Sequence, residues 1–98
     1  MKYVQMDGAT AIVAVDGRYD LLKTQAVNNE LDTAFQNGCT QVVVDFSRTT
    51  YIDSAVERDL VRTRRKVRPE NFSARNASGD VLAALKAAKF DTWLKQRQ

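Results

Sequence analysis

A run of β-branched residues in the middle of the chain constrains its fold more than any other feature. Residues 42–46 read V-V-V-D-F. A strand buried on both faces, as in the middle of a parallel sheet, has a nearly continuous apolar run. Neither of its faces meets water, so apolar and polar residues do not alternate along it. The sequence therefore predicts a central strand at this place, with Val43 in the core.

The segment after this strand predicts the start of a helix. It is polar at first, becomes apolar at Tyr51–Ile52 and then presents Asp53 and Ser54. Residues 54–57 fit a capping box, in which the serine hydroxyl accepts from a backbone N–H one turn on and the carboxylate of Glu57 accepts from the serine N–H. The pattern places a serine hydroxyl at a helix N-terminus, at the carboxyl end of a buried strand. Open α/β sheets meet ligands and partners at that edge.

Two antiparallel strands are predicted before the central strand. Asp7-Gly8 separates the apolar residues 3–6 from residues 9–15, and Asp-Gly is a strong signal for a type I′ hairpin turn. The Gly17–Asp20 segment then leads into a helix, with Asp20 as its candidate N-cap. Gly38 is the expected left-handed stop of this helix. Its apolar residues recur at helical spacing and are predicted to lie on one buried face: Leu22, Ala26, Val27, Leu31, Ala34 and Phe35.

The second half of the chain predicts two more helices around a weak strand. The helix opened by Ser54 should end before Pro69, because the residue before a proline disfavours helix. Residues 71–75 are a possible strand that the pattern alone also allows as a loop, and residues 78–80 begin a third helix with Leu85 in the core. Residues 91–94 are expected to add a final turn that packs on the body.

These elements predict a single α/β domain of the order β-β-α-β-α-β-α. Strand-helix-strand units make right-handed crossovers between parallel strands. The sheet is therefore expected to be mixed and four-stranded, with an antiparallel N-terminal strand and with the main helices covering its apolar face. In the second helix the apolar residues are predicted to point inward and the charged ones mostly outward; the apolar set is Val56, Leu60, Val61 and Val67, and the charged set is Arg58, Asp59, Arg62, Arg64, Arg65 and Lys66.

The central residues also resemble a known family. The run 43–47 followed by residues 51–54 is similar to the signature of STAS domains, the family of bacterial anti-sigma factor antagonists, and Gly17-x-x-Asp20 matches a second, weaker part of the pattern. The resemblance covers nearly the whole chain and implies one STAS-like domain over residues 1–98. In the antagonists a partner kinase phosphorylates the serine of the Asp-Ser pair, which is Ser54 here.

The resemblance implies a bacterial regulator of transcription that binds a kinase-type anti-sigma factor through phosphorylatable Ser54 and its surroundings. The implied partner-binding residues are Asp20, Asp53, Ser54, Ala55, Val56 and Glu57. The family usually continues after the serine with a small hydroxyl residue, a glycine and an aliphatic residue, which this chain replaces with Ala55-Val56-Glu57. The alternative is therefore a structural STAS subunit without phosphorylation, for example in a lipid-transport ATPase complex.

Ser54 also has a purely structural interpretation. As an N-cap it would contribute about 1 kcal/mol and have no further role. A phosphate on it would carry roughly −1.5 to −2 charges, favoured by the helix N-terminus but repelled by Asp53 and Glu57. Asp45, at the end of the central strand, is interpreted as a hydrogen-bonding group of the sheet rim rather than a metal ligand.

Composition argues against an enzyme. The 98 residues include Cys39 as the single cysteine and no histidine, so the commonest general base and the usual metal ligands are missing. No glycine-rich phosphate loop is present. We therefore predict no catalytic residue, no metal and no cofactor. With no apolar run of about 20 residues and no signal peptide, the expected location is cytoplasmic, without membrane insertion.

A basic cluster follows on the second helix, at Arg62, Arg64, Arg65, Lys66 and Arg68. Its simplest interpretation is a solvated helix face, followed by a surface for an acidic protein partner. Nucleic acid ranks third, because the net charge is only +3 and no aromatic residues are interleaved with the basic ones.

Overall fold

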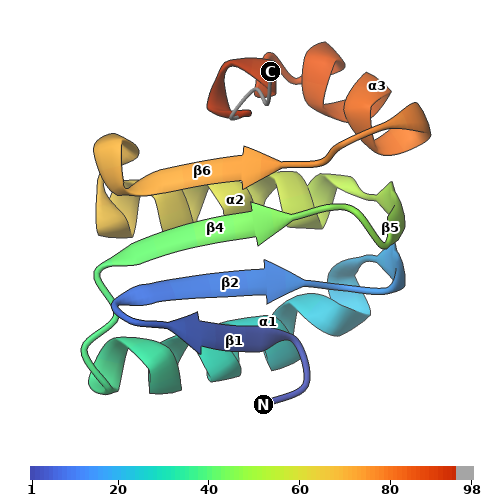
Figure 1. The fold of residues 1–98 in the computed structure, drawn as a ribbon. Coiled ribbons are helices and arrows are strands. Elements are labelled where there is room, and N and C mark those ends of the chain that lie inside the picture. Colours follow the sequence, from blue (N-terminus) through green and yellow to red (C-terminus); the bar gives the residue numbers. More distant parts are fainter. Residues whose placement is uncertain (95–98) are drawn as a thin grey trace.

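The computed structural model describes residues 1–94 and contains a four-stranded sheet in the order β1-β2-β4-β6 (Figure 1). Strand β2 pairs in parallel with β4, and β4 pairs in parallel with β6, whereas β1 is antiparallel to β2. The predicted mixed α/β sheet is confirmed, including the weak last strand. The strand bounds are β1 Val4–Asp7, β2 Thr10–Ala14, β4 Gln41–Asp45 and β6 Phe72–Arg75.

Helices α1 (Leu21–Gln36) and α2 (Ser54–Val67) cover one face of this sheet (Figure 1). Helix α3 (Gly79–Ala87) instead lies beyond the β6 edge and contacts β5. The expectation that the main helices cover the apolar face is therefore correct for two of the three. Two short 3-10 turns complete the described elements, η1 at Pro69–Asn71 and η2 at Asp91–Trp93.

Within residues 1–94 no helix covers the opposite face of the sheet (Figure 1), and this corrects the prediction for the central strand. Val42 and Val44 are buried, whereas Val43 is only half-buried and stands in register between Ile12 and Ser73. Successive side chains of a strand point to opposite faces, so covering one face buries every second valine. Val43 is therefore not a core residue, whereas the predicted burial of Leu85 is confirmed.

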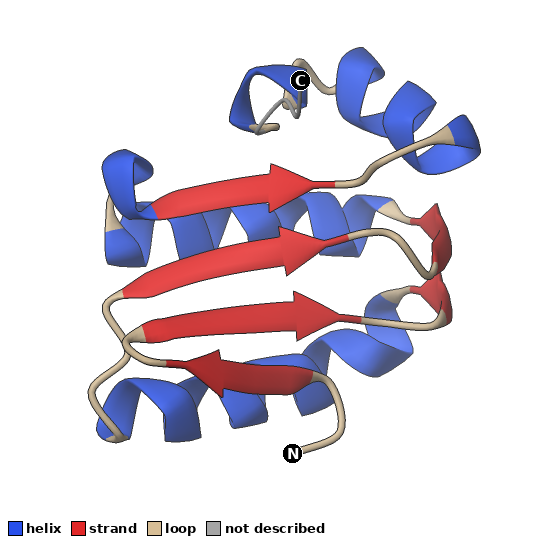
Figure 2. Cartoon of the chain, viewed as in Figure 1, coloured by secondary structure: helices blue, strands red, loops and turns tan. Residues whose placement is uncertain are grey.

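Two short strands that the sequence did not predict stand at the carboxyl ends of β2 and β4 (Figure 2). They are β3 (Gly17–Tyr19) and β5 (Thr49–Ile52), and they pair in parallel. The Thr49 hydroxyl also donates to the carbonyl of Val15 at 2.7 Å. Since β3 precedes α1 and β5 precedes α2, their pairing brings the starts of the two helices together.

The predicted hairpin exists, but its turn is shifted by one residue. Asp7 pairs with Thr10, so the two loop residues are Gly8 and Ala9. Gly8 has a φ of 62°, and Ala9 is not among the residues with positive φ. A type I′ turn needs positive φ at both loop positions, so the turn follows the II′ pattern, with glycine first.

Helix α1 buries Val27, Leu31 and Ala34 as predicted, but the prediction was wrong for Leu22 and Ala26. Its buried residues are Thr24, Val27, Leu31 and Ala34, whereas Leu22 is 87% exposed and Ala26 is exposed. At 100° per residue, Leu22 lies about 140° around the helix axis from Val27, on the solvent side. The helix ends as expected, with Gly38 at a φ of 95°.

Helix α2 departs from the predicted pattern at Asp59, which is buried rather than outward. Val61 is half-buried, whereas the other three apolar residues assigned to the core are buried. The helix ends at Val67, and Arg68, which precedes Pro69, has a φ of 80°. Proline thus ends the helix as predicted.

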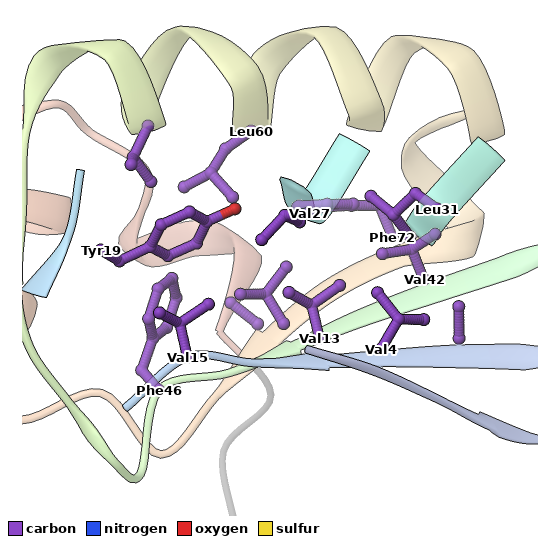
Figure 3. Packing of buried hydrophobic residues seen from close by; sticks show 14 of the residues in the cluster. Val4, Val13, Val15, Tyr19, Val27, Leu31, Val42, Phe46, Leu60 and Phe72 are labelled. Atoms are coloured by element: carbon purple, nitrogen blue, oxygen red, sulfur yellow. The ribbon is translucent and has the colours of Figure 1, made fainter. Parts of the chain in front are cut away.

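The core lies between the two helices and the sheet. The ring of Tyr19 stands between Leu60 of α2 and the side chains of Val15 and Phe46 (Figure 3). The expected final turn also packs on the body, because the Trp93 ring meets the Phe72 ring edge-on at a centroid distance of 5.6 Å. Within residues 1–94, no helix has the length and apolar character needed to cross a membrane.

Candidate functional site

The adjacent starts of α1 and α2 are joined by one carboxylate, that of Asp53. Asp53 is the N-cap of α2, with φ −109° and ψ 179°. Its Oδ1 accepts from the backbone N–H of Val56 at 3.0 Å, and its Oδ2 accepts from the backbone N–H of Leu21 at 3.0 Å. One side chain therefore satisfies an unpaired donor in the first turn of each helix.

This arrangement corrects the capping box predicted at Ser54. The N–H of Glu57 donates to the backbone carbonyl of Asp53 at 3.1 Å, so the helix begins one residue earlier than a capping box at Ser54 requires. Ser54 is instead the first helical residue. Its side chain is exposed, and its hydroxyl makes no hydrogen bond to any residue in the described part of the chain.

Asp20 occupies the N-cap position of α1 as predicted, but its side chain caps nothing. Its backbone is extended, and its carbonyl accepts from the N–H groups of Lys23 and Thr24. Oδ2 lies 3.6 Å from Nε of Arg18, whereas Oδ1 is buried and has no hydrogen-bond partner in residues 1–94. The cap predicted for Asp20 is therefore supplied by Asp53.

The three residues after Ser54 differ in what they offer a partner. Ala55 and Glu57 are half-buried, but Val56 is completely buried under α2. With no exposed surface, the side chain of Val56 lies beneath this site rather than on it. Val56 lies four residues before Leu60, about one helical turn, so both side chains are on the inward face of the helix.

Exposed apolar side chains surround this site, and the sequence analysis missed them. Leu21 is 64% exposed and Leu22 is 87% exposed at the start of α1. Tyr51 of β5 is 38% exposed, and the Arg18 guanidinium lies 4.1 Å from the centroid of its ring. The sequence could have predicted the exposure of Leu22. If Val27 and Leu31 face the core, the helical repeat places Leu22 on the outer face.

Asp45 closes the carboxyl end of β4, as interpreted. Its Oδ1 accepts from the Ser47 N–H at 2.9 Å and from the Asn76 amide at 3.2 Å, and its Oδ2 lies 3.2 Å from Nε of Arg75. Burial alone would raise the pKa of Asp45, but the hydrogen bonds from Ser47, Asn76 and Arg75 outweigh it and hold the pKa below its ordinary value. No group of three histidine, cysteine or acidic side chains that could hold a metal occurs in residues 1–94.

Asp59 links the two helices a second time, deeper in the molecule. Its Oδ2 accepts from the Asn28 amide of α1 at 3.0 Å, and its Oδ1 accepts from Nη1 of Arg62 at 2.6 Å. Burial and the nearby Asp59 charge together raise the pKa of the Tyr19 hydroxyl well above its ordinary value. Asp53, the N-cap of α2, and Asp59 within it thus both join α2 to α1.

Most of the basic cluster is exposed to solvent, as its simplest interpretation predicted, although Arg64 is half-buried. The Arg64 guanidinium lies 4.9 Å from the centroid of Trp93, and Nζ of Lys66 lies 4.6 Å from the centroid of Phe35. Lys66 is also 3.9 Å from Asp32. Arg65 and Arg68 remain exposed.

Comparison with protein families gives a match over residues 3–96 to the model described as "Mlab, STAS domain". The chain belongs to the STAS domain family. A search of curated protein sequences gave no match.

Solved structures of anti-sigma factor antagonists have the same fold. The unphosphorylated anti-sigma factor antagonist SpoIIAA matches with a TM-score of 0.83 and 17% identity, over 97% of this chain and 86% of SpoIIAA. An anti-sigma factor antagonist from Mycobacterium paratuberculosis matches with a TM-score of 0.79 and 18% identity, over 96% and 83% of the two chains. Phosphorylated SpoIIAA from Bacillus matches with a TM-score of 0.71 and 19% identity, over 97% and 89%.

Proposed function

We propose that this STAS domain is a non-enzymatic regulatory module of the anti-sigma factor antagonist type. In this proposal it binds a kinase-type anti-sigma partner in the cytoplasm through the edge where α1 and α2 begin. Phosphorylation of Ser54 releases the partner. Asp20, Asp53, Ala55 and Glu57 surround the serine and belong to the same surface.

The observation that carries the proposal is the division of roles between Asp53 and Ser54. Asp53 accepts the helix-start hydrogen bonds, so the Ser54 hydroxyl is exposed and uncommitted. A serine that acts as the cap loses its hydrogen bond when it is modified, which costs about 1 kcal/mol. Ser54 can accept a phosphate without that loss, so a modified domain is expected to stay folded.

The physical basis of release is desolvation. A phosphate at the first turn of α2 is stabilised locally by the helix N-terminus. Burying that doubly charged group against a partner costs several kcal/mol unless a basic group receives it. Modification therefore weakens docking more than it weakens the fold.

The test requires the native partner, recovered by pull-down with the wild-type domain and identified by mass spectrometry. Binding of the purified partner is then measured by calorimetry for wild type, Ser54→Ala and Ser54→Asp. We expect Ser54→Ala to bind as wild type does and Ser54→Asp to bind at least tenfold more weakly, about 1.4 kcal/mol. Incubation with the partner and ATP should add one phosphate, on Ser54.

Ser78→Asp is a matched control, because Ser78 is also an exposed serine at a helix start whose side chain makes no capping hydrogen bond. It should leave the affinity unchanged. Equal affinity of the Ser54 variants, together with no phosphate on Ser54, would refute the switch.

A structural STAS subunit without phosphorylation is the second candidate. Its support is the set of carboxylates near Ser54, because Asp53 is the preceding residue and Glu57 lies one turn later on the helix. Both would repel a phosphate at this position. A partner that is a transporter subunit without kinase activity would favour this function.

A further inference from the structure

A groove of about 290 Å³ runs between the first turns of α1 and α2. Its walls are Leu21, Thr24, Gln25 and Asn28 from α1 and Ala55, Arg58, Asp59 and Arg62 from α2. It adjoins the Ser54 site, because Arg58 lies one helical turn beyond Ser54 on α2. What this groove can bind follows from its two chemically different walls.

The α2 wall carries two arginines, and only one of them has an ion-pair partner in the described chain. Arg58 is exposed and makes no ion pair or hydrogen bond with another residue in the described chain. The Arg62 side chain is 72% exposed, but Asp59 anchors its guanidinium at 2.6 Å. Asp59 in turn is buried and held by Asn28 at 3.0 Å. One arginine is therefore positioned at the groove and the other is free to contact an anion.

The α1 wall is mixed, because Leu21 is apolar whereas Thr24, Gln25 and Asn28 are polar. Leu21 lines the groove with 64% of its surface exposed, and Leu22 beside it is 87% exposed. Two neighbouring leucines on a helix surface next to a polar groove are typical of a protein interaction site. Nucleic-acid phosphates would pair with the arginines but leave the two exposed leucines in water. The combination of walls favours a peptide ligand.

We propose that the groove binds an acidic amphipathic segment of the protein partner. The apolar side chains of the segment pack against Leu21 and Leu22, and its carboxylates pair with Arg58 and Arg62. This inference rests on the proposed function only in that the groove adjoins Ser54. It assigns the partner a chemistry that neither Ser54 nor its phosphorylation requires.

The probe is a short synthetic helical peptide with glutamates on one face and leucines on the other. Its matched counterpart carries lysines in place of the glutamates, and single-stranded and duplex DNA oligonucleotides serve as competing ligands. Each is titrated into the ¹⁵N-labelled, unphosphorylated domain and followed by NMR at about 0.15 M salt, where the Debye length is about 8 Å. The glutamate peptide should shift the amides of residues 21–28 and 55–62, and the lysine peptide and DNA should not.

Two charge reversals on the same helix locate the contact. Arg58→Glu should raise the dissociation constant of the glutamate peptide at least about fivefold, since it replaces an attractive contact with a repulsive one. Arg65→Glu makes the same charge change at another exposed position outside the groove, about 10 Å along the helix. Its effect should stay within about twofold. Amide spectra of both variants confirm that they are folded.

Four results would overturn the proposal. They are no binding of the glutamate peptide at millimolar concentration, equal binding of the lysine peptide, equal losses from the two charge reversals, and binding of DNA that depends on Arg58. The measurement uses no phosphate, so its failure leaves the proposed role of Ser54 untouched. Conversely, loss of the Ser54 switch would not alter the expected peptide binding.

Discussion

Asp20 and Asp53 occupy the same position at the starts of two neighbouring helices, yet their side chains do opposite things. Both have an extended backbone at an N-cap, with φ of −137° and −109°. The Asp53 carboxylate accepts one N–H from each helix, whereas the Asp20 carboxylate caps neither and has a buried oxygen with no hydrogen-bond partner among the described residues. Position relative to a helix therefore does not determine which carboxylate stabilises it.

The difference comes from the strand pair β3–β5. By placing the two helix starts side by side, it puts the N–H of Leu21 within reach of Asp53, which lies 32 residues later. One carboxylate then serves both helices, and Asp20 and Ser54 are left without a capping role. We regard this as the feature that leaves a serine hydroxyl available on a stable helix start.

The largest expected effect is at Asp53. Asp53→Ala removes the acceptor of two helix-start donors and should lower the free energy of unfolding by about 2 to 4 kcal/mol, more than a single lost cap. Urea unfolding measures this value. Asp20→Ala is the matched control, and a loss of equal size there would contradict the assignment of the capping role to Asp53.

The second prediction concerns the other carboxylate that joins the helices, Asp59, and its neighbour Tyr19. The pKa of Tyr19 is raised in the folded state, so the protonated hydroxyl is the form that folding favours. The Tyr19 hydroxyl makes its full contribution to the free energy of unfolding below the unfolded pKa of about 10. Above that pH the contribution is lost at about 1.4 kcal/mol per pH unit. Between pH 9 and about 11, the free energy of unfolding should therefore fall more steeply for wild type than for Tyr19→Phe. Parallel curves would contradict the burial of the tyrosine beside Asp59.

A smaller effect is expected at Ser54. Because its hydroxyl caps nothing, Ser54→Ala should change the free energy of unfolding by less than about 0.5 kcal/mol. The capping box predicted from the sequence would cost about 1 kcal/mol when it is removed. Thermal unfolding followed by circular dichroism distinguishes these two outcomes. A loss of about 1 kcal/mol or more would show that the Ser54 hydroxyl does cap the helix.

The smallest effect is expected at Asp20. Asp20→Asn replaces a charged group that has one buried, unpaired oxygen with a neutral group of the same shape. The charge is costly to bury, but Arg18 at 3.6 Å offsets part of that cost. The variant should be within about 0.5 kcal/mol of wild type in urea unfolding. A loss above about 1 kcal/mol would show that Asp20 stabilises its helix after all.

Long local patterns in the sequence predicted most of the fold. The hairpin, the central strand, the three helices and the parallel order of the last three strands all follow from periodicity, glycine and proline. Errors arose where burial depends on what covers a surface. Val43 belongs to the same run as its buried neighbours but faces the open side of the sheet, and Leu22 is apolar but lies on the outer face of α1.

The candidate site was predicted less completely. The sequence located Ser54 at a helix start, but it could not show that Asp53 reaches the N–H of Leu21, because that contact depends on two strands of only three and four residues. Asp59 looked like a surface charge, and only the packing of the two helices explains its burial. Contacts between distant segments therefore determine the details of this site.

Amide hydrogen exchange at Leu21 and Val56 tests the central claim most directly, because these are the two N–H groups that donate to Asp53. Both amides should be protected in wild type and equally protected in Ser54→Ala and Ser54→Asp. Asp53→Ala should lose the protection of both amides while those in the middle of α2 keep theirs. Loss of protection at Val56 in Ser54→Ala, with protection retained in Asp53→Ala, would contradict the account.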